Sequence, residues 1–293
     1  MQYNTLISAE ALKHNQNNPN WITVDCRFSL ADPETGAKAY RMGHLRNARY
    51  AHLDRDLSSS ISDFTGRHPL PNFVELVNKL GQWGVSNNSQ IVVYDDSAGA
   101  FAARLWWLLR YLGHEAVAVL NGGVQHWRQL GYPLTTCLPT PEQRLFRPYP
   151  SLSDWINALD VENGLAKKSI CLVDARTSER FQGKSEPIDP VAGHIPGAIN
   201  RPFQTNLNND GLFLSSEQLR SQFLQLTGDK SPKQIVHMCG SGVTACHNVL
   251  AMEYCGLAGS KLYPGSWSEW IRNKNRAVVN PYHINLSNDI NRS

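Results

Sequence analysis

The sequence lacks the features that would place the protein in a membrane or on nucleic acid. No apolar run reaches the roughly eighteen residues that a membrane-spanning helix needs. The opening segment, MQYNTLISAEALKHN, has neither the basic nor the apolar region of a secretion signal. A formal net charge of only +3 does not favour a nucleic-acid partner. We therefore expect a cytoplasmic protein with no membrane or nucleic-acid partner, in which any anion site depends on local basic residues.

Closely spaced cysteines are missing as well. The chain has six cysteines, and no two of them have the C-x-x-C spacing of zinc or redox sites. Without a secretion signal, they are expected to be free thiols in a reducing compartment. They are Cys26, Cys137, Cys171, Cys239, Cys246 and Cys255.

What the sequence does contain is an internal repeat with a period of about half the chain. Four blocks of the first half recur in the same order in the second: WITVDCR at 21–27 and ICLVDAR at 170–176, GHLRNA at 43–48 and GHIPGA at 193–198, QIVVYDDS at 90–97 and QIVHMCGS at 234–241, VLNGGVQHW at 119–127 and KLYPGSWSEW at 261–270. The shared order predicts a duplicated domain. Segment 138–150 carries four prolines and is expected to be a semi-rigid linker. The predicted boundaries are therefore 1–137 for the first domain, 151–277 for the second and 278–293 for a polar tail.

Each half alternates short β-branched runs with helical patterns. Continuous Val and Ile runs suit strands that are buried on both faces, as in parallel sheets. The predicted strands are Ile22–Val24, Ile91–Tyr94, Ala116–Val119, Ile170–Val173, Ile235–Met238 and Lys261–Tyr263. Apolar residues at helical spacing occur over 101–112 and 243–254. The alternation predicts an α/β fold made of two similar domains.

One loop combines the elements of a nucleophilic anion site. The strand at 235–238 runs into the loop CGSGVT at 239–244, and a helix is predicted from Ala245. Backbone N–H groups converge at such a loop, and the helix N-terminus adds partial positive charge. Both effects favour the thiolate, which is the nucleophilic form of cysteine. The loop therefore favours a catalytic Cys239 over a buried cysteine with a structural role.

These motifs resemble the two-domain sulfurtransferases of the rhodanese family. CGSGVTA at 239–245 is similar to the active-site loop of the mercaptopyruvate-type members, and GHIPGA, GSWSEW, DAR and GRHPLP match further family motifs over about residues 5–275. The resemblance implies tandem rhodanese domains, each a mostly parallel sheet flanked by helices, with the catalytic cysteine in the second. It also implies transfer of a sulfur atom from 3-mercaptopyruvate or thiosulfate, through a persulfide on Cys239, to a thiol, cyanide or a thioredoxin-like protein. No metal or organic cofactor is expected.

The resemblance also implies which residues form the site. The small anionic donor is expected to meet Arg180, Gly240, Ser241, Gly242, Val243, Thr244, Asp54 and His68 around Cys239. Arginine suits this role because a guanidinium can bind an anionic group with two parallel hydrogen bonds. Other motifs occur in both halves, whereas only one half has the cysteine, so they are expected to be structural. These are His44 and His194 of the Gly-His turns, and the Asp-x-Arg residues Asp25, Arg27, Asp174 and Arg176.

The two halves differ at the catalytic position, and this difference bears on the alternatives. Asp95 matches Cys239 in the first half, and a carboxylate cannot form a persulfide, so the first domain is expected to be catalytically silent. A cysteine phosphatase uses a similar loop but would need an arginine where this chain has Ala245. A non-catalytic binding module is the other alternative, and the retained Cys239 with its full loop argues against it.

Two indicators of donor preference conflict. Thiosulfate-preferring members carry an Arg-Lys pair after the cysteine, and this chain has Gly240-Ser241, which favours 3-mercaptopyruvate. The mercaptopyruvate pattern, however, has a second arginine nine residues after the first, and this chain has Asp189 at that distance from Arg180. Because the loop contacts the reacting sulfur, we expect it to outweigh the missing arginine. The expected donor is 3-mercaptopyruvate, with thiosulfate as the alternative.

Overall fold

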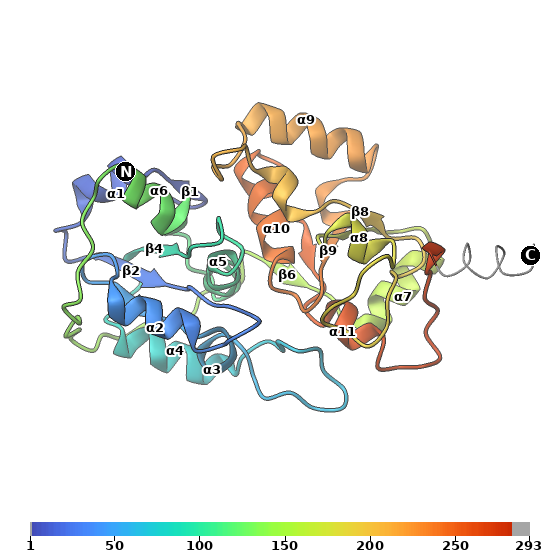
Figure 1. The fold of residues 1–293 in the computed structure, drawn as a ribbon, viewed down its shortest axis with the longest axis horizontal. Coiled ribbons are helices and arrows are strands. Elements are labelled where there is room, and N and C mark those ends of the chain that lie inside the picture. The colour runs from blue at the N-terminus through green and yellow to red at the C-terminus, as the bar shows by residue number, and fades with distance from the viewer. Residues whose placement is uncertain (1, 283–293) are drawn as a thin grey trace, which may run out of the picture.

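The computed structural model describes residues 2–282 and contains two five-stranded sheets (Figure 1). The strand order is β1-β5-β4-β2-β3 in the first sheet and β6-β10-β9-β7-β8 in the second. All pairings between these strands are parallel. The second order equals the first with five added to every strand number, so the repeat in the sequence is a duplication of the whole domain. The predicted α/β fold with two mostly parallel sheets is confirmed.

The strands agree with the predicted segments at the centre of each sheet and extend beyond them at the edges. The first sheet contains β1 (Leu6–Ile7), β2 (Trp21–Asp25), β3 (Arg49–Tyr50), β4 (Gln90–Tyr94) and β5 (Val117–Leu120), and the second contains β6 (Asp154–Trp155), β7 (Cys171–Asp174), β8 (Ile199–Asn200), β9 (Ile235–Met238) and β10 (Lys261–Leu262). All six predicted strands are present, and each end lies within one residue of its prediction. The four unpredicted strands are edge strands of two residues each, too short to show a hydrophobic period.

Helices flank both sheets, and one pair of helices joins the two domains. The helices are α1 (Ala9–Asn15), α2 (Thr35–Met42), α3 (Leu53–Asp56), α4 (Phe73–Gln82), α5 (Ala102–Tyr111), α6 (Gly123–Gln129), α7 (Ala158–Ala166), α8 (Ser178–Phe181), α9 (Ser216–Thr227), α10 (Ala245–Tyr254) and α11 (Ser266–Trp270), with 3-10 turns at Phe203–Asn206 and Pro232–Gln234. Helices α5 and α10 follow the central strands β4 and β9 and pack against each other between the sheets (Figure 1). Buried Trp107 of α5 and Leu250 of α10 belong to the same hydrophobic core, so the two domains share apolar packing.

Three segments outside these elements complete the described chain. Segment 138–150, the predicted linker, contains no helix or strand. The loop between α3 and α4 reaches across to the second domain, where the N–H of Arg67 donates to Oγ of Ser268 at 3.0 Å (Figure 1). Of the predicted tail, Val279 forms an antiparallel bridge with His194, and residues 283–293 lie outside the described residues. Within residues 2–282, no helix is long and apolar enough to cross a membrane.

Candidate active site

Cys239 is the first residue after the central strand β9, and its sulfur sits in a tight turn of the following loop. The N–H of Gly242 donates to Sγ of Cys239 at 3.2 Å. Gly242 has φ +75°, and a Cβ at this position would lie 2.2 Å from the carbonyl oxygen of Pro264. Only glycine therefore allows the turn that brings this N–H to the sulfur. The sulfur thus has a backbone N–H donor of the kind that anion-binding loops supply.

The start of α11 supports the loop from the other side, which explains the motif GSWSEW. Oγ of Ser266 accepts from the N–H of Cys239 at 3.1 Å. The N–H of Trp267 donates to the carbonyl of Cys239 at 3.1 Å, and the N–H of Ser268 donates to the carbonyl of Gly240 at 2.9 Å. These bonds fix the backbone on both sides of Cys239, so the sulfur has a defined position.

The matching loop of the first domain shows what this geometry binds. Asp95 is the first residue after β4, which confirms that it is the counterpart of Cys239. One oxygen of the buried Asp95 carboxylate accepts from the N–H groups of Ser97 and Gly99, and the other accepts from those of Phe101 and Ala102, all at 2.8 Å. A side chain of the protein thus fills an anion cradle of backbone N–H groups in the first domain.

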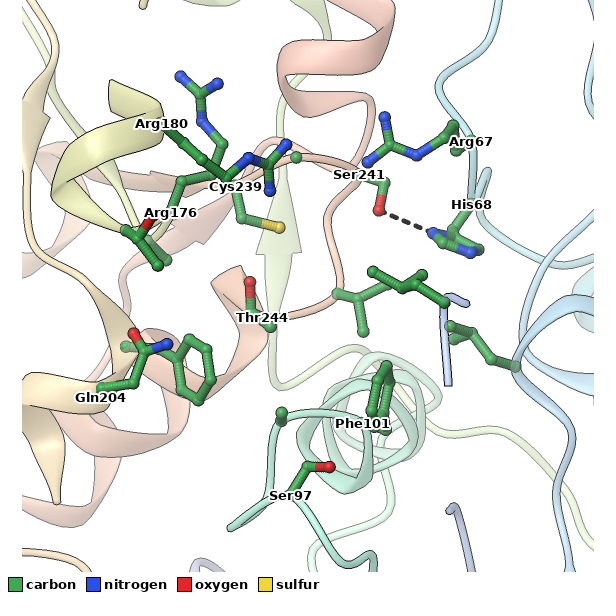
Figure 2. Close-up of a pocket in the computed structure, with 18 residues that line it drawn as sticks. Arg67, His68, Ser97, Phe101, Arg176, Arg180, Gln204, Cys239, Ser241 and Thr244 are labelled. Atoms are coloured by element: carbon green, nitrogen blue, oxygen red, sulfur yellow. Dashed lines mark hydrogen bonds between the residues drawn. The ribbon is translucent and has the colours of Figure 1, made fainter. Parts of the chain in front are cut away.

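A pocket of about 300 Å³ opens on Cys239 and is lined by both domains (Figure 2). Seven of the nine predicted site residues line it: His68, Arg180, Cys239, Gly240, Ser241, Val243 and Thr244. Gly242 and Asp54 do not line it, but each contacts a residue that does. Gly242 donates its N–H to the sulfur of Cys239, and Asp54 contacts Nε2 of His68. Arg67, Phe101 and Gln204 also line the pocket and were not singled out by the sequence patterns. Among the described residues, no group of histidine, cysteine or acidic side chains is arranged to hold a metal ion.

Three side chains form a hydrogen-bonded relay that crosses the domain boundary. Nδ1 of His68 lies 2.7 Å from Oγ of Ser241 (Figure 2), and its Nε2 lies 3.2 Å from Oδ1 of Asp54. Burial lowers the pKa of His68, and the hydrogen bond to Asp54 offsets only part of this effect. The imidazole is therefore neutral at pH 7, with Nε2–H donating to Asp54 and Nδ1 accepting from the hydroxyl of Ser241. His68 is buried rather than exposed, which places it in the site.

Arg180 lies in a chain of alternating charges above the loop. Glu186 accepts from Arg180 at 2.7 Å and from Arg176 at 3.3 Å. Asp189 accepts from Arg180 at 3.1 Å and also pairs with Arg67 of the first domain. Burial raises the pKa of Asp189, and Arg67 and Arg180 partly offset this increase. Asp189 does stand where the mercaptopyruvate pattern has a second arginine, and the structure pairs it with Arg67 from the other domain.

The Asp-x-Arg and Gly-His residues, which are repeated in both domains, form matching contacts in the two domains. Arg27 pairs with Asp25 and donates to the carbonyl of Gly43, whereas Arg176 pairs with Asp174 and donates to the carbonyl of Gly193. His44 and His194 bond to backbone carbonyls through Nδ1, at 2.8 Å in each case. This geometry agrees with the predicted structural roles. Arg176 additionally lines the pocket, which its counterpart Arg27 does not.

Arg104 of α5 ties the two halves of the site together. Its guanidinium is fully buried and donates to the carbonyl of Gly242 at 3.1 Å and to those of His68 and Pro69 at 3.1 and 3.2 Å. Burial lowers the pKa of Arg104, whereas interaction with the thiols of Cys246 and Cys239 raises it. Its guanidinium therefore lies beside the loop that carries Cys239. Sequence patterns could not reveal this residue, because it lies within an apolar helix and its partner Gly242 is 138 positions away.

Comparison with known proteins agrees with this fold and site. The family model described as the rhodanese-like domain matches residues 8–130 and 157–273. The chain belongs to the rhodanese-like family and contains its domain twice. A protein of Pseudomonas aeruginosa named "probable 3-mercaptopyruvate sulfurtransferase" is 45% identical over 94% of this chain and 97% of that protein. The thiosulfate sulfurtransferase of Mus musculus is 34% identical over 92% and 93%. The solved structure of 3-mercaptopyruvate sulfurtransferase from Leishmania major is 30% identical with a TM-score of 0.77, covering 91% of this chain and 74% of that chain.

The contacts of Arg104 yield a prediction. Arg104→Met removes a hydrogen-bond donor from four backbone carbonyls, those of Leu57, Gly242, His68 and Pro69. It also removes a buried cation near the sulfur, so the loop should relax and the thiolate should be less favoured. We expect alkylation of Cys239 by iodoacetamide at pH 7 to slow by about tenfold, the effect of losing one charge-assisted contact. Arg110→Met, on the same helix and outside the pocket, is the control. An unchanged rate in a folded Arg104→Met variant would contradict this role.

Proposed function

We propose that the chain is a sulfurtransferase that carries a sulfur atom on Cys239 as a persulfide. The observation that supports this most directly is a thiol in a backbone N–H turn at the base of a pocket that three arginines line. Sulfur donors such as 3-mercaptopyruvate and thiosulfate are small anions, and these arginines match their charge. Some relatives are named for 3-mercaptopyruvate and others for thiosulfate. The names therefore support sulfur transfer more strongly than the choice of donor.

The reaction proceeds in two half-reactions. The Cys239 thiolate attacks the outer sulfur of the donor, a sulfur–sulfur bond forms, and the bond between that sulfur and the rest of the donor breaks. Thiosulfate then leaves as sulfite, and 3-mercaptopyruvate leaves as the enolate of pyruvate, which takes up the proton of the donor thiol. An acceptor thiolate or cyanide removes the outer sulfur and restores the Cys239 thiolate. The N–H groups of the loop and the N-terminus of α10 stabilise negative charge on the persulfide.

The relay of Asp54, His68 and Ser241 suits the proton transfer that 3-mercaptopyruvate requires. Neutral His68 accepts a hydrogen bond from Ser241, so the hydroxyl can receive the donor's proton as it passes its own to the imidazole. Asp54 stabilises the imidazolium that forms. Thiosulfate needs no such transfer, so the relay supports 3-mercaptopyruvate as the preferred donor.

The first domain completes the pocket without carrying sulfur in this proposal. It contributes Arg67, His68 and Phe101 to the lining, whereas its own loop is filled by Asp95. The acceptor is a small thiol, cyanide or a thioredoxin-like protein, and the compartment is the cytoplasm. All six cysteines are free thiols, which supports a reducing compartment.

The test of sulfur transfer is the loading of Cys239. Incubation with either donor, followed by intact and peptide mass spectrometry, should place one additional sulfur on Cys239, and cyanide should release it as thiocyanate. Cys239→Ser should accept no sulfur, because a hydroxyl cannot form a persulfide. Cys137→Ser, which alters an exposed thiol of the chain, is the matched control. Sulfur on Cys246, or turnover by Cys239→Ser, would refute the assignment.

The choice of donor is tested by comparing the kinetics of the two donors. We expect kcat/KM for 3-mercaptopyruvate to exceed that for thiosulfate at matched cyanide, because the loop is uncharged at Gly240 and Ser241 and the relay serves only the first donor. Ser241→Ala should lower kcat for 3-mercaptopyruvate by about tenfold or more and leave the thiosulfate reaction nearly unchanged. Equal losses with both donors would contradict the role of the relay. A higher kcat/KM for thiosulfate would reverse the donor preference.

The state of His68 sets a pH dependence. Because burial lowers its pKa below the ordinary value of 6.5, His68 is mostly neutral at pH 6.5 and becomes mostly protonated only at a lower pH. The 3-mercaptopyruvate reaction should therefore have an acidic limb with a midpoint under 6.5. Asp54→Asn should move this limb to lower pH, because the Asp54 carboxylate raises the pKa of His68.

Two comparisons separate this limb from other titrations. His68→Gln should remove it, whereas His14→Gln, at an exposed position of α1, should leave it in place. A limb that survives His68→Gln would show that another group controls the reaction at low pH.

A further inference from the structure

We propose that Arg67 of the first domain binds the anionic end of the donor together with Arg180, and that Asp189 positions Arg67 for this task. The two arginines form an anion clamp across the domain boundary. The identity of the anion as a sulfur donor rests on the proposed function, whereas the presence of an anion site beside Cys239 does not.

Asp189 lies between the two guanidinium groups and holds both. Its Oδ2 accepts from Nη2 of Arg180 at 3.1 Å, and its Oδ1 accepts from Nη1 of Arg67. The Asp189 side chain is only 3% exposed. Two cations repel each other at short range, and a buried carboxylate between them offsets that repulsion. Asp189 therefore brings a second arginine to the same side of the loop as Arg180.

The remaining nitrogens of the clamp converge on the residue next to the nucleophile. A Cβ at Gly240 would lie 2.9 Å from Nη2 of Arg67, and 3.4 and 3.5 Å from Nη2 and Nη1 of Arg180. Nη2 of Arg180 already bonds Asp189, so Nη2 of Arg67 and Nη1 of Arg180 remain for a ligand. Figure 2 shows Arg180 and Arg67 reaching toward the loop at Cys239 and Ser241 from two different directions. An anion that bridges the two nitrogens would lie beside Gly240, with its reacting sulfur toward Cys239.

The backbone of Arg67 is fixed on the second domain, although Arg67 belongs to the first. Its N–H donates to Oγ of Ser268 at 3.0 Å. The neighbouring Gly66 packs so closely that a Cβ there would lie 2.5 Å from the carbonyl oxygen of Gly265. The Arg67 side chain is 22% exposed, so a ligand can reach it from the pocket. A fixed backbone and an accessible guanidinium are what a binding residue needs.

The chemistry of the clamp defines the class of ligand. Two guanidinium ends on one side of a pocket of about 300 Å³ suit a small carboxylate or sulfonate with at least two oxygens. Both proposed donors have such a group. The clamp therefore supplies the second arginine of the mercaptopyruvate pattern from another part of the chain, and Asp189 is the residue that makes this exchange possible.

A pair of alkylating reagents tests the clamp without sulfur transfer. Iodoacetate carries a carboxylate and iodoacetamide is its neutral analogue, so the ratio of their rates at Cys239 reports the anion site and cancels the reactivity of the thiol. Exposed Cys137 supplies the reference ratio in the same sample, read by peptide mass spectrometry. We expect a higher ratio at Cys239 than at Cys137.

Substitution of Arg67 is the deciding step. In the full chain, Arg67→Met should lower the ratio at Cys239 by about tenfold, and Arg67→Lys should retain part of it. Arg110→Met removes an arginine of another interdomain ion pair and should leave the ratio unchanged. Thermal unfolding shows whether each variant is folded. A ratio that is the same in wild type, Arg67→Met and Arg67→Lys would overturn the proposal.

Asp189 is tested through its coupling to Arg67. If Asp189 positions Arg67, the effect of Arg67→Met should be smaller in an Asp189→Asn background than in the wild type. A larger effect would mean that Asp189 competes with the incoming anion, and would overturn the positioning role. If the ratios behave as expected while no thiocyanate forms, the sulfurtransferase proposal fails and the anion clamp stands.

Discussion

The backbone N–H groups that converge after each central strand need an anionic partner, and the rest of the site depends on how each domain supplies one. In the first domain the carboxylate of Asp95 accepts four such N–H groups and closes the loop from within. In the second domain the sulfur of Cys239 accepts from Gly242, and a pocket lies beside it. The same fold thus closes one loop with its own carboxylate and leaves a thiol beside a pocket in the other, by exchanging a single acceptor.

The first domain forms part of the candidate active site. Helix α5, which follows the Asp95 loop, packs against α10, which follows the Cys239 loop. From α5, Arg104 reaches the carbonyl of Gly242, and from the loop before α4, His68 reaches Ser241. Because each contact joins a residue of one domain to the catalytic loop of the other, the geometry at the sulfur depends on the docking of both domains.

How far the sequence predicts this site depends on the range of the interactions. The strands, the Cys239 loop and the position of its counterpart Asp95 follow from local patterns and from the repeat, and the structure agrees. Arg104 carries no such pattern, and the motif GRHPLP contains Arg67 without indicating its role. Their contacts with Gly242 and Asp189 span 138 and 122 positions. Asp189 illustrates the difficulty: taken alone it indicates a lost arginine, and only its spatial neighbours reveal the second one.

The charges around the pocket explain why the low net charge of the chain is compatible with an anion site. Arg67, Arg176 and Arg180 alternate with Asp174, Glu186 and Asp189, so the six formal charges cancel. No overall field attracts the anion, and selectivity must come from the direction of individual N–H donors. Exposed charges lose their influence over about 8 Å at physiological salt, whereas buried and partly buried contacts are screened much less. Recognition by oriented donors in a neutral cluster therefore binds a small anion without a basic surface that would attract larger polyanions.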